Sequence, residues 1–422
     1  MEHDLVLEGR VVVPSGLQDT EVGVTDGAIS AIGHGLRGAR KIKTERCLIF
    51  PGFIDIHVHL REPGWEAKED FRTGTKAAAH GGVTTVVDMP NNLIPATTKS
   101  ALGAKRRLAD EKAVVDVRFN GGVSQSYIEG VREISEDVVG YKIFLSDTTG
   151  VGAFPISELG RSFEAIAKTL KPVSLHCEAQ PVIDKFRRKL EGLGAEPSDL
   201  RPPEAEAEAV DAVISEMKKV PDLTANISHA SISHTLESVR QAKESGTRVF
   251  CEAALHHLYF NRREFSENRL LKTNPPLRSE EDRQSMLGGL KSGIASFLVT
   301  DHAPHTKRDK TELGSAGVPG LDDYGHVVSW LIKEQGVDPL TVAKVASYNP
   351  SEFLKLNDRG EISLGKKADF TILDIHSPEK VVEEKIQSKC GWSPYEGKIF
   401  PGRTRWTLVS GETLVDDFEM AV

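Results

Sequence analysis

The sequence predicts an α/β protein whose main part is a (β/α)₈ TIM barrel of parallel strands, and three observations support this. Short apolar runs alternate with longer helical patterns between about residues 48 and 303, which is the rhythm of repeated strand and helix units. There are eight such runs, the number that closes this type of barrel. Strand-like segments of a different texture lie at both ends of the chain, and these predict a small second domain.

The eight predicted strands are short and rich in β-branched residues, and each is followed by a pattern that favours a turn or a helix. The first run is apolar up to its closing histidines, and the later ones are mostly five to eight residues long, which fits strands better than helices. In chain order they cover residues 48–60, 83–89, 114–120, 139–145, 173–177, 223–229, 247–254 and 296–301.

Polar or ionisable side chains gather at the C-terminal ends of these runs. The C-terminal strand ends of a barrel meet at one face, so we expect these side chains to converge on one pocket. A doubly wound open sheet would also have polar strand ends, but it usually has fewer than eight strands in such regular sequence. The residues concerned are His57, His59, Asp88, Asn91, Asn120, Lys142, His176, His229, Glu252 and Asp301.

The two ends of the chain predict short strands that have no core of their own. Residues 4–13 and 21–29 read as short strands, with an Asp-Gly turn between apolar neighbours. Residues 367–374 and 406–415 have the same strand-like pattern. Such strands must pair with something. We therefore expect residues 1–52 and 360–422 to build one composite β-sandwich domain, with the barrel, residues 53–359, inserted between them.

The overall charge indicates the kind of partner, and the cysteine content indicates the cellular compartment. The net charge of −9 disfavours binding to nucleic acid or to an anionic membrane, so a small-molecule substrate is expected. The four cysteines form no CxxC pair, which predicts a reducing compartment and not a disulfide framework. The sequence shows no signal peptide or apolar span of membrane length, and these observations together predict a cytoplasmic protein.

The pair His57 and His59 is the most informative motif. Side chains two positions apart on a strand point to the same side, so both imidazoles can bind one metal ion, and Arg61 continues the same alternation. Alone, His176 or His229 would more often be a histidine packed in the core. As a set, four histidines and a terminal aspartate at separate strand ends are enough ligands for two divalent ions and favour a metal hydrolase; the aspartate is Asp301.

Lys142 and Asp301 carry the remaining chemistry. A lysine buried near two cations loses its proton readily, and the neutral amine can take up carbon dioxide to form a bridging carbamate. The alternatives are that Lys142 extends to the rim of the barrel, or that Asp147 supplies the anion. Asp301 can bind a metal and also take a proton from water and transfer it to a leaving nitrogen.

Four motifs together resemble the amidohydrolase superfamily and, within it, the dihydroorotase family with a composite β domain. The order and spacing of the motifs across the barrel are specific for the superfamily. They are residues 55–64 (DIHVHLREPG), 81–91 (GGVTTVVDMPN), 272–278 (KTNPPLR) and 300–306 (TDHAPHT).

The resemblance implies a binuclear centre and a substrate-binding set. It implies that His57, His59 and Asp301 bind one ion, that His176 and His229 bind the other, and that an N6-carboxylated Lys142 bridges them. Zinc is the first candidate, with cobalt and manganese as alternatives. The substrate carboxylate would be held by Arg61, Asn91 and His305. The ring would be contacted by Asn274 and by the backbone of the loop 317–320, through Pro319 and Gly320.

The activity implied by the resemblance is the reversible cyclisation of N-carbamoyl-L-aspartate to L-dihydroorotate in pyrimidine biosynthesis, through attack of a metal-bridging hydroxide on the ring amide. Allantoinase and dihydropyrimidinase or hydantoinase are the alternatives, and residues 141–150 are somewhat allantoinase-like. A catalytically inactive relative that serves as a scaffold is disfavoured, because every expected ligand position is filled. Whether the chain forms a homodimer or a complex with enzymes of the same pathway is left open by the sequence.

Overall fold

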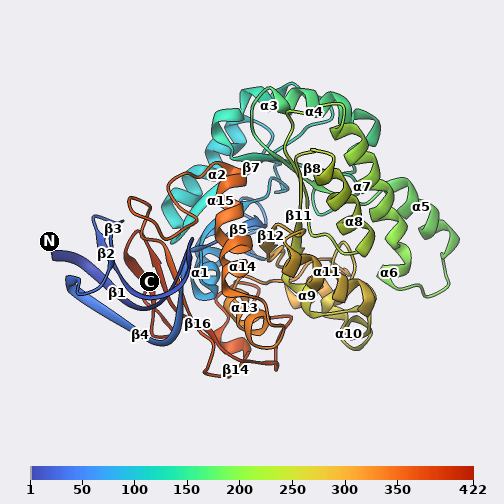
Figure 1. Cartoon of the computed structure of the whole chain (residues 1–422). Helices are drawn as coiled ribbons and strands as arrows, with labels where there is room; N and C mark the ends of the chain where they lie inside the picture. Colours follow the sequence, from blue (N-terminus) through green and yellow to red (C-terminus); the bar gives the residue numbers. More distant parts are fainter. Residues whose placement is uncertain (1) are drawn as a thin grey trace.

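The computed structural model describes residues 2–422, and two eight-stranded sheets dominate it. One sheet is the barrel, surrounded by helices, and the other lies beside it and contains both ends of the chain (Figure 1). The predicted α/β barrel fold is confirmed.

The barrel strands pair in chain order, and all their pairings are parallel. The first and last strands meet through a parallel bridge between Val58 and His302, and the backbone N–H of His59 donates to His302 O at 2.8 Å. The strands are β5 (Phe53–Val58), β6 (Val83–Asp88), β7 (Asp116–Gly122), β8 (Gly140–Phe144), β9 (Val173–His176), β10 (Ala225–Ile227), β11 (Val249–Ala254) and β12 (Phe297–Val299).

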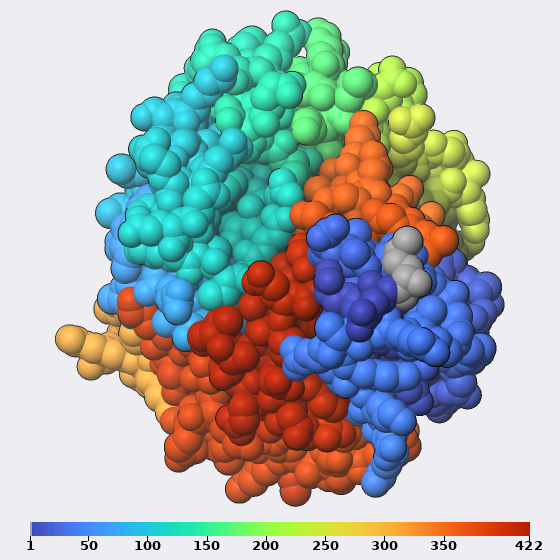
Figure 2. All heavy atoms as spheres, turned by 90° about the vertical axis from the view of Figure 1, so that its left-hand side faces the viewer, coloured from blue at the N-terminus to red at the C-terminus, as the bar shows by residue number. Residues whose placement is uncertain are grey.

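The second sheet is mixed and joins the two ends of the chain, which lie side by side on one face of the molecule (Figure 2). At its centre β4 pairs in parallel with β1 and antiparallel with β13, so a C-terminal strand is hydrogen-bonded to an N-terminal one. The strand order is β18 (Glu419–Met420), β17 (Glu412–Asp416), β16 (Arg403–Val409), β13 (Phe370–Asp374), β4 (Arg37–Pro51), β1 (Glu2–Val13), β2 (Gly16–Thr25) and β3 (Ala28–Gly33).

The predicted first barrel strand, residues 48–60, is two strands in two different sheets. β4 ends at Pro51 and β5 begins at Phe53, and between them the N–H of Gly52 donates to Asp369 O at 2.8 Å. The run reads as continuous because both pieces are buried on both faces, so hydrophobicity alone does not mark the change of sheet.

The helices of the barrel fill the connections between its strands, and the C-terminal helices lead back to the mixed sheet (Figure 1). They are α1 (Phe71–Gly81), α2 (Lys99–Lys112), α3 (Gly130–Glu133), α4 (Leu159–Ala167), α5 (Gln180–Lys189), α6 (Pro197–Leu200), α7 (Pro203–Met217), α8 (Ser233–Glu244), α9 (Leu255–Tyr259), α10 (Arg262–Glu267), α11 (Glu280–Ser292), α12 (Lys307–Glu312), α13 (Tyr324–Lys333), α14 (Pro339–Ala343) and α15 (Asn349–Leu354). Short helical turns cover residues 135–137, 156–158, 269–271, 344–348 and 383–385, and β14 (Glu379–Lys380) pairs with β15 (Ile399–Phe400). Within residues 2–422, no helix has both the length and the apolar character needed to cross a membrane.

Helix α1 shows how local sequence sets the position of a helix next to the site. Asp70 caps its N-terminus by accepting a hydrogen bond from the Thr73 N–H at 2.8 Å, which satisfies one of the free amides of the first turn. Gly82 ends the helix with a left-handed backbone (φ 92°), which favours glycine. The capped helix follows the loop that carries Arg61 and Lys68.

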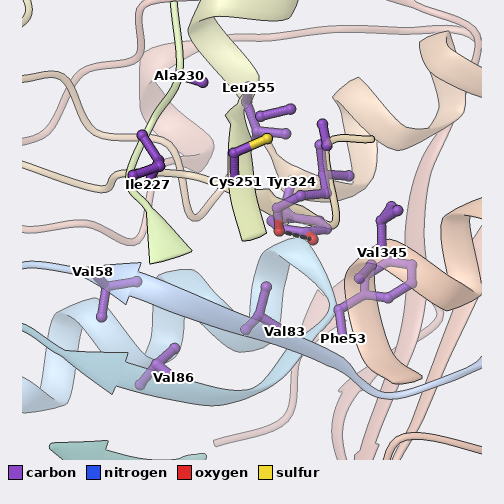
Figure 3. Packing of buried hydrophobic residues seen from close by; sticks show 14 of the residues in the cluster. Phe53, Val58, Val83, Val86, Ile227, Ala230, Cys251, Leu255, Tyr324 and Val345 are labelled. Carbon is purple, nitrogen blue, oxygen red and sulfur yellow. Dashed lines mark hydrogen bonds between the residues drawn. The ribbon is translucent and has the colours of Figure 1, made fainter. Parts of the chain in front are cut away.

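A continuous apolar core packs against the barrel strands beneath the end of the barrel that carries the polar residues. Phe53 of β5 packs against the Tyr324 ring of α13 with 5.2 Å between ring centroids, and the Tyr324 hydroxyl donates to Leu298 O at 2.9 Å. Figure 3 shows this pair together with buried side chains of other barrel strands, such as Val86 and Cys251. The close packing fixes the strands, so the polar residues at their ends have defined positions.

Candidate active site

His57 and His59 lie at the end of β5, buried, with both Nε2 atoms directed at Asp301. Each Nε2 is 3.3 Å from Asp301 Oδ1. Suitable ligand atoms of the three residues lie within 4.8 Å of one another, so together they could hold a metal ion. The predicted convergence of the first strand and the last one is therefore present in the fold.

The other nitrogens of these imidazoles are occupied. His57 Nδ1 donates to Glu252 Oε2 at 2.7 Å, and His59 Nδ1 lies 2.7 Å from Asn91 Oδ1, which accepts from it. Burial lowers the pKa of His59 to about 3, which keeps this ring neutral at physiological pH. With their Nδ1–H groups engaged, both Nε2 atoms present lone pairs to the Asp301 carboxylate.

Left-handed backbone turns aim three of the side chains at the site. Arg61, His229 and Asp301 have φ values of 62°, 36° and 47°. Non-glycine residues seldom adopt this conformation, and where they do it is often at functional positions. Here each turn follows a barrel strand and directs a polar side chain towards the barrel mouth, which sequence patterns do not reveal.

His176 and His229 form a second pair beside the first. His176 Nδ1 and His229 Nε2 face each other at 2.9 Å, and the His229 ring centroid is 5.1 Å from that of His57. His176 Nε2 donates to Glu178 Oε2 at 2.8 Å, which leaves a lone pair on Nδ1. Burial is the first cause of the lowered pKa of both histidines, so both are neutral bases.

Lys142 is buried in the middle of β8 and donates to the Ser228 hydroxyl. Burial lowers the pKa of its amine to about 8, the direction required for a neutral amine. The side chain lines a cavity of about 330 Å³ next to the histidine pocket, and Phe144 lines both. Asp147 is exposed and its Oδ1 accepts from the Ala153 N–H, so it lies away from this cluster.

A cluster of basic groups borders the histidines. An Arg61 terminal nitrogen lies 3.2 Å from His305 Nε2, and Lys68 Nζ lies 3.1 Å from His305 Nδ1. Burial lowers the pKa of Arg61 to about 10, which leaves it charged at neutral pH. This edge of the site is suited to a small anion.

The other predicted substrate residues divide between the pocket and its surroundings. Asn91 and Asn274 line the pocket, but the Asn91 amide is engaged, since its Nδ2 also donates to Thr149 O at 3.1 Å. From the loop after α12, the residues that line the pocket are Ala316 and Gly317. The structure does not bring Pro319 and Gly320 into this lining, and the Gly320 N–H donates to His302 Nδ1 at 3.1 Å.

Two carboxylates behind the histidines have no role in the sequence-based assignment. Glu252 accepts from His57, from the His229 backbone N–H at 2.8 Å and from Asn226 at 2.6 Å. Glu178 accepts from His176 and Arg201. Hydrogen bonds of this kind fix the ring orientation and tautomer of metal-binding histidines. In the sequence, the one indication of a role for Glu252 and Glu178 is that each lies near the C-terminal end of a predicted strand.

Glu252→Gln is expected to lower turnover roughly ten- to hundredfold. Glutamine replaces one acceptor oxygen with an NH₂ donor. In the Oε2 position this group faces the donors of His57 and of the His229 backbone, and in the Oε1 position it faces the Asn226 amide, so in either rotamer the network that orients the His57 ring is weakened. The kcat/KM of the metal-loaded enzyme and its metal content measure this. Glu208→Gln, an exposed change on α7, is the matched control. Equal activity of the two variants would contradict the assigned role of Glu252.

The donor set fits divalent metal ions. Two Nε2 lone pairs and a carboxylate oxygen meet at 3.3 Å without a proton among them, and acceptors arranged in this way repel one another unless a cation lies between them. The Nδ1 of His229 is buried without a hydrogen-bond partner among the described residues. Imidazole and carboxylate ligands suit zinc, cobalt and manganese.

Comparison with known proteins gives consistent matches over the whole chain. A sequence model of the amidohydrolase family matches residues 48–412. A dihydroorotase of Pyrococcus abyssi is 33% identical over 99% of this chain and 96% of that protein, and an allantoinase of Enterococcus faecalis is 31% identical over 98% and 96%. The L-hydantoinase (dihydropyrimidinase) structure from Arthrobacter aurescens superposes with a TM-score of 0.95 at 24% identity, covering 100% of this chain and 98% of that one, which is a likeness of fold.

Proposed function

This chain belongs to the amidohydrolase family, and we propose that within it the protein is a dihydroorotase, which interconverts L-dihydroorotate and N-carbamoyl-L-aspartate. The observation that carries the proposal is the buried Arg61 and His305 pair next to the His57, His59 and Asp301 cluster. Among the cyclic amides considered, dihydroorotate has a ring carboxylate, whereas allantoin and unsubstituted hydantoin have none. The P. abyssi dihydroorotase, similar over its whole length, adds support.

In this proposal His57, His59 and Asp301 would hold one divalent ion and His176 and His229 a second, and Lys142, once carboxylated, would supply a further anionic ligand. Zinc is the first candidate. Such ions, when bound, supply Lewis acidity and make water a nucleophile at neutral pH. Glu252, Asn91 and Glu178 keep the imidazoles in the tautomers that the ligand positions require.

The chain's own residues then orient the substrate and move one proton. In this proposal Arg61, His305 and Asn91 hold the ring carboxylate. Arg61 and Asn91 line the pocket, whereas His305 lies outside its lining, in contact with Arg61 at 3.2 Å. Asn274 and the Gly317 loop border the ring. Water adds to the ring amide carbon, the bond from this carbon to the ring nitrogen breaks, and Asp301 carries the proton of the attacking water to that nitrogen. The reverse sequence closes N-carbamoyl-L-aspartate with loss of water.

Allantoin hydrolysis is the second candidate, and one observation favours it. The E. faecalis allantoinase is nearly as similar to this chain as the dihydroorotases are. A neutral ring offers no anionic partner to the cationic edge, and a buried charge without such a partner costs free energy. The buried Arg61 guanidinium therefore favours the carboxylate-bearing substrate.

A side-by-side assay of the zinc-loaded enzyme with L-dihydroorotate, allantoin and hydantoin tests the proposal. We expect kcat/KM for dihydroorotate to exceed the other two by at least about a hundredfold, because discrimination through a buried polar contact is strong. N-carbamoyl-L-aspartate at slightly acidic pH should give the reverse reaction. Faster turnover of allantoin than of dihydroorotate would refute the assignment and replace it with the second candidate.

A further inference from the structure

Lys68 lies in the loop between β5 and α1, and its side chain is only 19% exposed. Its ammonium lies 3.1 Å from His305 Nδ1 and 3.7 Å from Asp309 Oδ2. No motif of the sequence assigned it a role. The shorter of these two contacts is with a residue of the proposed carboxylate site, on the side of the ring opposite Arg61.

The two contacts of His305 compete for one lone pair. An ammonium and a guanidinium have only donors. Arg61 meets Nε2 at 3.2 Å and Lys68 meets Nδ1 at 3.1 Å, but a neutral imidazole has a single acceptor nitrogen. Burial first, and then Arg61, Lys68 and Lys310, lower the pKa of His305, against the smaller opposite effect of a hydrogen bond with the Ala316 backbone, so the ring is neutral. One of the two cations therefore faces an N–H group.

The position of the ring indicates which nitrogen faces the ligand. A Cβ built on Gly317, which lines the pocket, would lie 3.3 Å from His305 Cδ2. Cδ2 adjoins Nε2 in the ring, so the Nε2 edge is turned to the pocket side and the Nδ1 edge to Lys68. The backbone of this segment is fixed as well, because Trp392 Nε1 donates to His305 O at 2.8 Å and Arg61 Nε donates to Pro304 O at 3.2 Å.

We propose that Lys68 is a positioning residue for anion recognition: by donating to His305 Nδ1 it holds the ring proton on Nε2, where the N–H and the Arg61 guanidinium face one anionic group. An anion between them accepts from both donors and removes the repulsion between two donors that meet without it. The inference rests on the proposed function, because the anion in question is the ring carboxylate of the substrate. In this role Lys68 influences which substrate the enzyme prefers without touching the substrate.

The tautomer is tested directly by long-range ¹H–¹⁵N correlation spectra of the zinc-loaded protein labelled in its histidines. His305→Gln identifies the His305 signals. We expect the Nε2–H tautomer in the unmodified protein and a shift towards the Nδ1–H tautomer in Lys68→Met, which keeps the length of the side chain and removes its donors. An Nδ1–H tautomer in the unmodified protein, or the same spectrum in Lys68→Met, would overturn the proposal.

Kinetics supply the second measurement. Lys68→Met should lower kcat/KM for L-dihydroorotate roughly ten- to hundredfold, mainly through KM, the range expected for loss of a charge-assisted hydrogen bond. Turnover of hydantoin, which has no carboxylate, should stay within about twofold. Lys99→Met, an exposed change at the start of α2, removes the same charge without this contact and should alter neither. An equal loss with both substrates would mean a structural role and count against the proposal.

Failure of this inference and failure of the proposed function give different results. If the unmodified enzyme does not hydrolyse dihydroorotate, the proposed function fails, while the tautomer spectra still decide what Lys68 does to His305. If dihydroorotate is hydrolysed and Lys68→Met neither changes the tautomer nor raises KM, the function stands and the role of Lys68 is refuted.

Discussion

Asp301→Asn is expected to reduce hydrolysis of L-dihydroorotate by roughly 10³-fold or more. The amide keeps the shape of the side chain but is a weaker ligand between His57 and His59, and it cannot accept the proton that must reach the leaving nitrogen. Asparagine also tolerates the left-handed backbone at this position (φ 47°), so the fold should be unaffected. Initial rates and metal content, measured on the same zinc-loaded sample, separate the two effects.

The control for this variant is Asp222→Asn, an exposed change before β10 that should leave both measurements unchanged. If Asp301→Asn retains metal but loses activity, the proton transfer is the larger contribution. If it loses metal as well, binding of the ion accounts for part of the loss. Activity within tenfold of the unmodified enzyme would contradict both roles of Asp301.

Arg61→Met is expected to lower kcat/KM for L-dihydroorotate roughly 10²- to 10³-fold, with hydantoin turnover much less affected. The guanidinium is 3% exposed and still charged at neutral pH, so its interaction with a carboxylate is little screened by solvent. Arg61→Lys should fall between the two, because lysine keeps the charge and loses the planar pair of donors. The measurement is kcat/KM of the unmodified enzyme, Arg61→Met and Arg61→Lys, each with L-dihydroorotate and with hydantoin.

The left-handed backbone at residue 61 strains methionine, lysine and arginine alike, so Arg61→Lys also controls for folding. Retained dihydroorotate turnover in Arg61→Met would contradict the carboxylate-binding role, and with it the preference for dihydroorotase over allantoinase. A parallel loss on hydantoin and dihydroorotate would show that Arg61 supports the site as a whole and does not select the substrate.

Much of the fold could be predicted because it depends on local pattern. Short apolar runs separated by helical segments predicted the eight barrel strands. The prediction of one strand over residues 48–60 was wrong, because these residues are divided at Gly52 between two sheets. Burial on both faces gives the two pieces the same composition, so the division depends on the pairing of Gly52 with Asp369, which is far away in the chain. The mixed sheet followed from the similar texture of the two chain ends.

The identity of the candidate ligands was also available from the sequence, because strand ends at the C-terminal face of a barrel must meet. His57, His59 and Asp301 do meet, although Asp301 lies more than two hundred positions further along the chain. Pro319 and Gly320, which were predicted to contact the ring, are not among the residues that line the pocket. Loop conformation has no simple period, and here Ala316 and Gly317 line the pocket.

Residue type and spacing are enough to predict the barrel, the family resemblance and the set of chemical groups at the site. The protonation and direction of those groups depend on contacts that form only in the folded chain. Glu252 reaches His57 across 195 positions and Lys68 reaches His305 across 237, and each contact selects one tautomer of an imidazole. A tautomer depends on the partner of each ring nitrogen, and that partner comes from another strand or loop brought near by folding.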